Sequence, residues 1–318
     1  MKVLKSTLFC IFTTIFCFSM MIGVSGCVDE HGDGKIDIVC TIFPVYDWVQ
    51  EIVGENDNIE ITLLVKSGED LHSYQPTIAD MATIASCDVF VYVGGESDDV
   101  WVEKALANAV NKDMIKINLL QLLGENAKEE EIVEGMQGEQ SDKAEYDEHI
   151  WLSLKNAQFF IDKLCLCLQQ LNDIDAQNFI SRANEYKQKL LLLDNEYTSA
   201  IQNAQKHTIL FGDRFPFLYL VSDYNLSYYA AFSGCSSDVE ASFQTIAFLS
   251  NKVDELGLNC ILIIDNSSDK IAKAIRDNTQ NKNQEILTLN SMQSSAYDSA
   301  SYLSVMQQNL QVIKRALE

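Results

Sequence analysis

Residues 175–205 contain neither proline nor glycine, and this stretch constrains the fold more than any other feature of the chain. Its apolar side chains recur at spacings of three and four residues, at Phe179, Ala183, Tyr186, Leu190, Leu193, Tyr197 and Ile201. A helix of ~30 residues spans about 45 Å, which exceeds the needs of one small domain. We therefore expect a rigid connecting helix within residues 172–206 that joins two lobes. Two helices with a bend are the alternative.

Short β-branched runs alternate with longer amphipathic stretches on both sides of this segment. The expected strands are 36–42, 58–65, 87–93, 114–118, 207–212, 226–232, 259–265 and 285–289. The expected helices are 45–54, 77–86, 99–110, 151–171, 213–224, 239–256, 268–280 and 297–317. Such alternation is typical of parallel sheets covered by helices. The sequence predicts an α/β fold of two lobes, residues 36–171 and 207–318, each a four-stranded, mainly parallel sheet with flanking helices.

The first residues have the layout of a bacterial lipoprotein signal. Lys2 and Lys5 precede an apolar run over residues 8–24, and small residues lead to Cys27. We interpret residues 1–26 as a signal peptide and Cys27 as the lipid-bearing residue, with an ordinary signal peptide as the alternative. Polar, glycine-rich residues 27–35 would then tether an extracytoplasmic protein to the membrane.

Composition excludes some classes of protein. The 318 residues are 47% hydrophobic, which excludes disorder for most of the chain, and a net charge of −23 argues against nucleic acid as a partner. Residues 125–148 hold ten acidic residues and two lysines, so we expect a solvated, mobile loop there. The acidic loop serves either solubility or weak attraction of a cation, and its composition does not distinguish the two.

Only four histidines occur in the chain. His31 lies in the tether and His207 at the start of an expected strand. His72 and His149 fall on loops that leave the carboxyl ends of strands, where parallel α/β sheets bind ligands. These two histidines are therefore the candidate ligand residues.

The residues around both histidines carry a resemblance to a known family. The segment Gly68-Glu69-Asp70-Leu71-His72-Ser73-Tyr74-Gln75-Pro76-Thr77 resembles the one that bears the first metal-binding histidine in zinc and manganese solute-binding lipoproteins of ABC importers (TroA-like and ZnuA-like). Asp147-Glu148-His149-Ile150-Trp151-Leu152 resembles the second such segment, and Thr41-Ile42-Phe43-Pro44 the first strand and turn. The resemblance extends from about residue 36 to the C-terminus. It implies a monomer with two lobes and a long connecting helix, in which His72 and His149 bind the metal.

The second half departs from the family pattern. The family's third ligand, a His or Glu, matches Gly212 or Arg214 here, depending on the alignment, and Asp213 is the neighbour able to bind a metal under both. We therefore predict Asp213 as the third ligand. The family's fourth ligand, an Asp, is replaced by Asn290, whose amide offers only a neutral oxygen. Other candidates expected at the same crevice are Cys235, Glu240 and Asp265.

The resemblance implies capture of Zn²⁺ or, next, Mn²⁺ as a transported ligand, and its delivery to an ABC permease and the ATPase of that permease. Two histidines with one carboxylate suit either ion. A diverged protein that binds a non-metal ligand, or a surface adhesin, is the alternative. We do not expect an enzyme, because the chain has no HExxH, GxSxG, P-loop or GxGxxG motif.

Overall fold

The computed structural model describes residues 34–66, 68–138, 145–234, 240–293 and 300–318. The predicted signal peptide, the lipidation residue Cys27 and most of the tether lie outside the described residues, as does Cys235. Residues 36–318 form one compact unit. No helix in the described part of the chain combines the length and the apolar character needed to cross a membrane.

The first sheet is fully parallel. Across the sheet its strands are β2 (Ile59–Leu63), β1 (Ile36–Cys40), β3 (Val89–Tyr92) and β4 (Ile115–Asn118). Its helices are α2 (Phe43–Val53), α3 (Ile78–Ser86), α4 (Glu96–Ala107) and the short α5 (Leu119–Leu123). Local chemistry sets the helix starts: Pro44 lies in the first turn of α2, and Thr77 and Asp80 form a capping box on α3.

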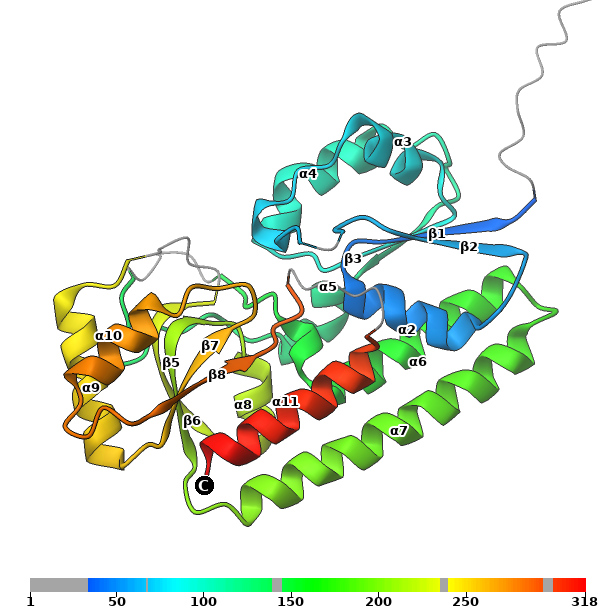
Figure 1. Cartoon of the computed structure of the whole chain (residues 1–318). Coiled ribbons are helices and arrows are strands. Elements are labelled where there is room, and N and C mark those ends of the chain that lie inside the picture. Colours follow the sequence, from blue (N-terminus) through cyan, green and yellow to red (C-terminus); the bar gives the residue numbers. More distant parts are fainter. Residues whose placement is uncertain (1–33, 67, 139–144, 235–239, 294–299) are drawn as a thin grey trace, which may run out of the picture. The chain divides into compact units, whose positions relative to one another are not determined.

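The second sheet repeats this arrangement. Its strands are β6 (Ser227–Ser233), β5 (Thr208–Phe215), β7 (Cys260–Ile264) and β8 (Glu285–Leu289), again all parallel. The helices that follow them are α8 (Leu218–Tyr224), α9 (Phe243–Leu256), α10 (Lys270–Asn278) and α11 (Tyr302–Ala316). Two four-stranded parallel sheets with flanking helices confirm the predicted fold class, and Figure 1 shows both of them. The lobe boundaries at residues 171 and 207 stay a prediction.

Strand β5 differs from its predicted extent. It continues to Phe215 through a bulge between Phe211 and Arg214, so α8 begins only at Leu218 instead of at residue 213. At Gly212 an added Cβ would lie 2.6 Å from the Cα of Ala272, in α10. Glycine is therefore required for α10 to pack this closely on β5.

The long segment forms one continuous helix. Helix α7 runs over Ala176–Gln202, and α6 (Leu154–Leu171) precedes it. The seven apolar positions that predicted the helix are its seven buried residues. Helix α7 packs against α2 and α6 from the first half and against α8 and α11 from the second, and Figure 1 shows α7 and α11 side by side. One helical face thus contributes to the core around both sheets.

A buried carboxylate connects three of these helices. Asp47, on α2, accepts hydrogen bonds from the Tyr186 hydroxyl on α7 at 3.1 Å and from the backbone N–H of Tyr302 on α11 at 3.2 Å. Burial raises the pKa of Asp47 to about 6, although both hydrogen bonds act in the opposite direction. The Tyr302 hydroxyl in turn donates to the carbonyl of Trp151 at 2.7 Å. Asp47 therefore joins elements from both halves of the chain.

The described ends of the acidic loop are packed against the protein, which corrects the expectation of a mobile loop for those residues. The backbone N–H of Gln137 donates to the carbonyl of Ala231 on β6. The Tyr228 hydroxyl donates to Glu131, and the backbone N–H of Lys128 donates to the Tyr219 hydroxyl. These contacts arise because the loop carries half-buried apolar side chains and backbone groups that pair with β6 and α8. Residues 139–144 lie outside the described residues.

Candidate metal site

His72 lies on a single helical turn (Leu71–Ser73) that follows β2. Asp70 caps this turn, because its Oδ1 accepts the backbone N–H of His72 at 3.0 Å. The Nδ1 of the imidazole lies 2.8 Å from the Ser97 hydroxyl and 3.2 Å from Glu148 Oε1. Ser97 also donates to Glu148, at 2.6 Å. A hydroxyl and a carboxylate therefore orient this ring.

His149 ends the acidic loop and is completely buried. Asp147 Oδ1 accepts its backbone N–H at 2.8 Å and lies 3.1 Å from its Nδ1. The Trp151 ring packs edge-on against the imidazole, with centroids 5.3 Å apart. A Cβ added to Gly234 would lie 3.0 Å from the imidazole Cε1. Because Gly234 has no side chain, the backbone after β6 can pack directly against the imidazole of His149.

The two imidazoles meet at their inner nitrogens. The Nε2 atoms of His72 and His149 lie 3.2 Å apart, although the residues are 77 positions apart in sequence. Each outer nitrogen, Nδ1, faces a carboxylate, from Glu148 and Asp147 respectively. A carboxylate on the outer nitrogen fixes the tautomer and makes the inner nitrogen a stronger metal ligand. This is the geometry expected of a pair of histidines that binds a transition metal.

The pKa values of Glu148 and His149 are both shifted at this pair. Burial acts to raise the pKa of Glu148, but the hydrogen bond and charge of His72 and the hydrogen bond from Ser97 outweigh it, so this pKa lies below its ordinary value. Burial acts to lower the pKa of His149, but the charge and hydrogen bond of Asp147 outweigh it, so this pKa is raised. A carboxylate therefore lies behind each imidazole, at its outer nitrogen.

Asp213, the predicted third ligand, has other partners. Its carboxylate accepts the backbone N–H of Arg214 at 2.8 Å and that of Ile264 at 3.1 Å. It is 5% exposed, and burial raises its pKa although these hydrogen bonds oppose the shift. Among the described residues, no group of three or more His, Cys, Asp or Glu side chains could hold a metal ion, so Asp213 does not join the histidine pair. The geometry gives the prediction for Asp213 no support, because the carboxylate fastens the β5 bulge to β7.

Two other candidates of the second half, Asp265 and Asn290, also bind backbone groups. Asp265 Oδ1 accepts both the backbone N–H and the hydroxyl of Ser291. Asn290 Oδ1 accepts the backbone N–H of Met292. The side chain of Glu240 is exposed, and its carbonyl accepts a hydrogen bond from Gln137. Asp265 and Asn290 therefore shape the turn after β8.

This turn carries a residue that the sequence analysis missed. Gln293 is 3% exposed, and its Nε2 lies 2.6 Å from the Nε2 of His72 and 2.5 Å from that of His149. Its position just after the last strand, at the edge where ligands bind, was the one available signal. The turn is also attached to the first half of the chain, because the Trp151 indole donates to the carbonyl of Ser291.

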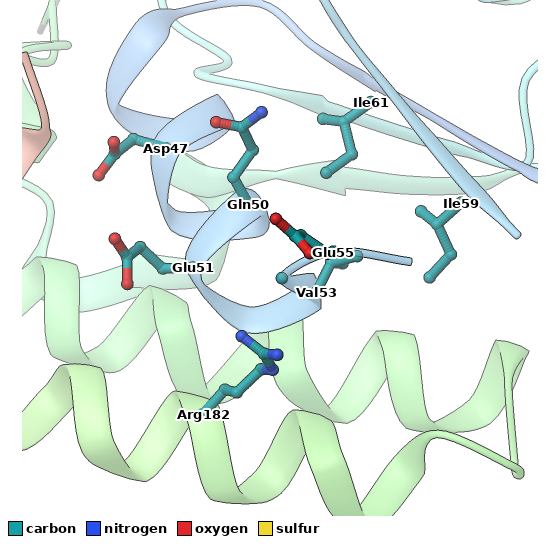
Figure 2. Close-up of a pocket in the computed structure, with 9 residues that line it drawn as sticks. Asp47, Gln50, Glu51, Val53, Glu55, Ile59, Ile61 and Arg182 are labelled. Carbon is teal, nitrogen blue, oxygen red and sulfur yellow. The ribbon is translucent and has the colours of Figure 1, made fainter. Parts of the chain in front are cut away.

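A pocket of about 620 Å³ lies elsewhere, beside α2 (Figure 2). It is lined by Asp47, Gln50, Glu51, Val53, Gly54, Glu55, Ile59, Ile61 and Arg182. None of these is a predicted ligand, and Asp47 is bonded to Tyr186 and Tyr302. We place the candidate site at the histidine pair, because convergent nitrogen donors and not open volume define a metal site.

A comparison with known proteins assigns the chain to a family. Residues 38–316 match the family described as "ZnuA: Zinc-uptake complex component A periplasmic". The chain belongs to this family. Its members are solute-binding proteins and not enzymes, as the sequence analysis expected.

The zinc-binding lipoprotein AdcA of Streptococcus pneumoniae is 29% identical over 295 residues, which cover 91% of this chain and 57% of that protein. The chain thus spans little more than half the length of the AdcA relatives that it matches. The high-affinity zinc uptake system protein ZnuA of Bacillus subtilis is 26% identical over 296 residues, which cover 92% of this chain and 90% of that protein. The crystal structure of the Zn(II)-bound ZnuA-like domain of Streptococcus pneumoniae AdcA superposes with a TM-score of 0.70 at 26% identity, covering 89% of this chain and 99% of that one.

Proposed function

We propose that this chain is the extracytoplasmic solute-binding subunit of an ABC importer, which captures zinc and delivers it to a membrane permease. One observation carries the proposal: the Nε2 atoms of His72 and His149 converge at 3.2 Å while carboxylates face both Nδ1 atoms. Imidazole nitrogen is a favoured ligand of zinc. Family membership and the names of the AdcA and ZnuA relatives support zinc as the cargo and a permease with its ATPase as the partner. Manganese is the second candidate ion.

Zinc binding by the purified full-length chain tests this proposal. We expect wild type to bind one zinc ion, and His72→Ala and His149→Ala each to weaken binding at least about a hundredfold, because loss of a ligand exceeds the ~10- to 100-fold effect of losing an outer-shell partner. Titration calorimetry and metal analysis after gel filtration would measure it. His207→Ala, an exposed histidine outside the site, is the matched control. Equal zinc binding by wild type and by a variant that carries both His72→Ala and His149→Ala would rule out this site.

We also propose that a lipid on Cys27 holds the protein at the membrane. The basic residues, apolar run and small residues before Cys27 support it, and so does the name of the AdcA lipoprotein. We expect metabolic labelling with a fatty acid to mark wild type but not Cys27→Ala, and the variant to leave the membrane fraction. Labelling of Cys27→Ala at the wild-type level would contradict the proposal.

A further inference from the structure

One ion pair joins the second sheet to the turn that carries His72. Arg214, near the end of β5, directs its guanidinium to Asp70, and its Nη2 lies 3.5 Å from Asp70 Oδ2. The other oxygen of the same carboxylate, Oδ1, caps the turn by accepting the backbone N–H of His72 at 3.0 Å. The pair therefore connects a strand of the second half with a proposed zinc ligand of the first.

The backbone of Arg214 is held at the β5 bulge. Its N–H donates to Asp213 Oδ1 at 2.8 Å, and Asp213 Oδ2 accepts the backbone N–H of Ile264, on β7, at 3.1 Å. A bulge redirects the side chains of its strand, and this one ends at Arg214. The position of the Arg214 side chain is therefore set by two neighbouring strands of the second sheet.

A continuous series of polar contacts thus runs from β7 to the first histidine. Its members, in order, are Ile264, Asp213, Arg214, Asp70 and His72. The contacts of Asp213 lie within the second half of the chain, and the cap on His72 lies within the first. The ion pair is the one contact of the series that joins the two halves, so it is the contact that must open if the second sheet withdraws from His72.

The guanidinium of Arg214 cannot itself bind a metal ion, because arginine stays protonated in proteins and has no acceptor atom. Its positive charge beside a cation site is neutralised by Asp70. Only 23% of the Arg214 side chain and 28% of the Asp70 side chain are exposed, so salt screens this pair less than a fully exposed one. The pair is therefore suited to hold the two halves of the site together.

We propose that Arg214 is a positioning residue that holds the His72 turn against the second sheet and thereby prolongs the residence of the captured ion. The ion pair with Asp70 keeps His72 in place while the site is closed, and its opening is a step in the release of the ion. This inference rests on the proposed function, and it assigns to Arg214 no contact with the ion.

Stopped-flow release of zinc from the full-length chain to an excess of chelator would test this role. We expect Arg214→Gln and Asp70→Asn each to accelerate release about two- to fivefold, the effect of losing one partly exposed ion pair. Asparagine still caps a helical turn, so Asp70→Asn removes the charge and keeps the cap on His72. The double variant should release zinc no faster than either single variant, because both changes remove the same contact.

Two further measurements separate positioning from a general loss of stability. Arg214→Lys, which keeps the charge, should retain a release rate close to that of wild type. The imidazole NMR signals of His72 should shift in Arg214→Gln and in Asp70→Asn, because the turn is no longer held from the second sheet.

Arg276 supplies the matched control. Its Nε lies 3.4 Å from Asp277 Oδ1 within α10, and 30% of its side chain is exposed. Arg276→Gln removes the same charge from the same half of the chain and should leave zinc release and the His72 signals unchanged.

Melting curves would show which variants fold. If Arg214→Gln folds and releases zinc at the wild-type rate or more slowly, the role of Arg214 is refuted and the proposed function stands. Effects of the two single variants that add in the double variant would refute the pairing independently. If wild type does not bind zinc, the proposed function fails and this inference fails with it.

Discussion

At the scale of single residues, some residues of the candidate site could be predicted from the sequence and others could not. The proximity of His72 and His149 could be predicted, because their flanking segments are distinctive and few histidines compete. The position of Gln293 beside them could not, because its contacts with the two imidazoles lie 221 and 144 positions away in sequence. Asp213 illustrates the converse: a carboxylate near the expected position is used by the backbone of β5 and β7.

Glu148 contacts the outer nitrogen of His72, so its effect on zinc affinity can be tested without removing a proposed metal ligand. It faces the Nδ1 of His72, although its sequence neighbour is His149. We expect Glu148→Gln to weaken zinc binding about 10- to 100-fold, because loss of an outer-shell carboxylate reduces the basicity and orientation of the ligand imidazole. Calorimetric titration with zinc would measure the change.

Asp162→Asn, which alters a surface carboxylate paired with Lys187, is the control for a lost negative charge. The two variants should differ clearly in zinc affinity. If both match wild type, Glu148 does not act through His72.

At the scale of helices and strands, most of the fold could be predicted from periodicity. Strand β8 has its predicted bounds, and the buried residues of α7 are those with helical spacing. Helix α5 was not predicted, because five residues are too few to show a helical period. The end of β5 was misplaced because a bulge extends the strand, and the pairing that reveals a bulge involves residues distant in sequence.

Asp47 gives the connection of α2, α7 and α11 a testable pH dependence. Its pKa is about 6 in the fold against an ordinary value of 3.8, so folding favours the protonated carboxyl. The protonated Asp47 carboxyl makes its full contribution to stability below pH 3.8. This contribution is lost as the pH rises through 6, and ionisation of Asp47 then lowers the free energy of unfolding by about 3 kcal/mol. We expect Asp47→Asn, which cannot ionise, to gain stability relative to wild type between pH 4 and pH 7, by up to about 3 kcal/mol.

Denaturant unfolding of both proteins from pH 4 to pH 8 would measure this. The loss of a hydrogen bond in the variant shifts the difference by a constant, whereas the ionisation of Asp47 makes it change with pH. Other titrating groups occur in both proteins and cancel. A difference in unfolding free energy that does not change with pH would contradict the role assigned to burial of Asp47.

At the scale of the whole molecule, the two sheets share more than a covalent connection. Helix α7 packs on helices from both halves, the ends of the acidic loop bind β6 and α8, and Gln293 meets the histidines of the first half. The sequence predicted two lobes but could not predict these contacts, because each joins segments far apart in the chain. The proposed zinc binding at the histidine pair would therefore depend on both sheets being folded.

The buried face of α7 packs on helices of both halves, and this determines how the protein would behave if its chain were cut into two fragments. A break in the chain between α7 and β5 would leave Tyr197 and Ile201 on one fragment and the helices α8 and α11 on the other. A break before α7 would expose α2 and α6 instead. Neither fragment would keep a complete apolar interior, so each should be insoluble alone and soluble only when both are produced together.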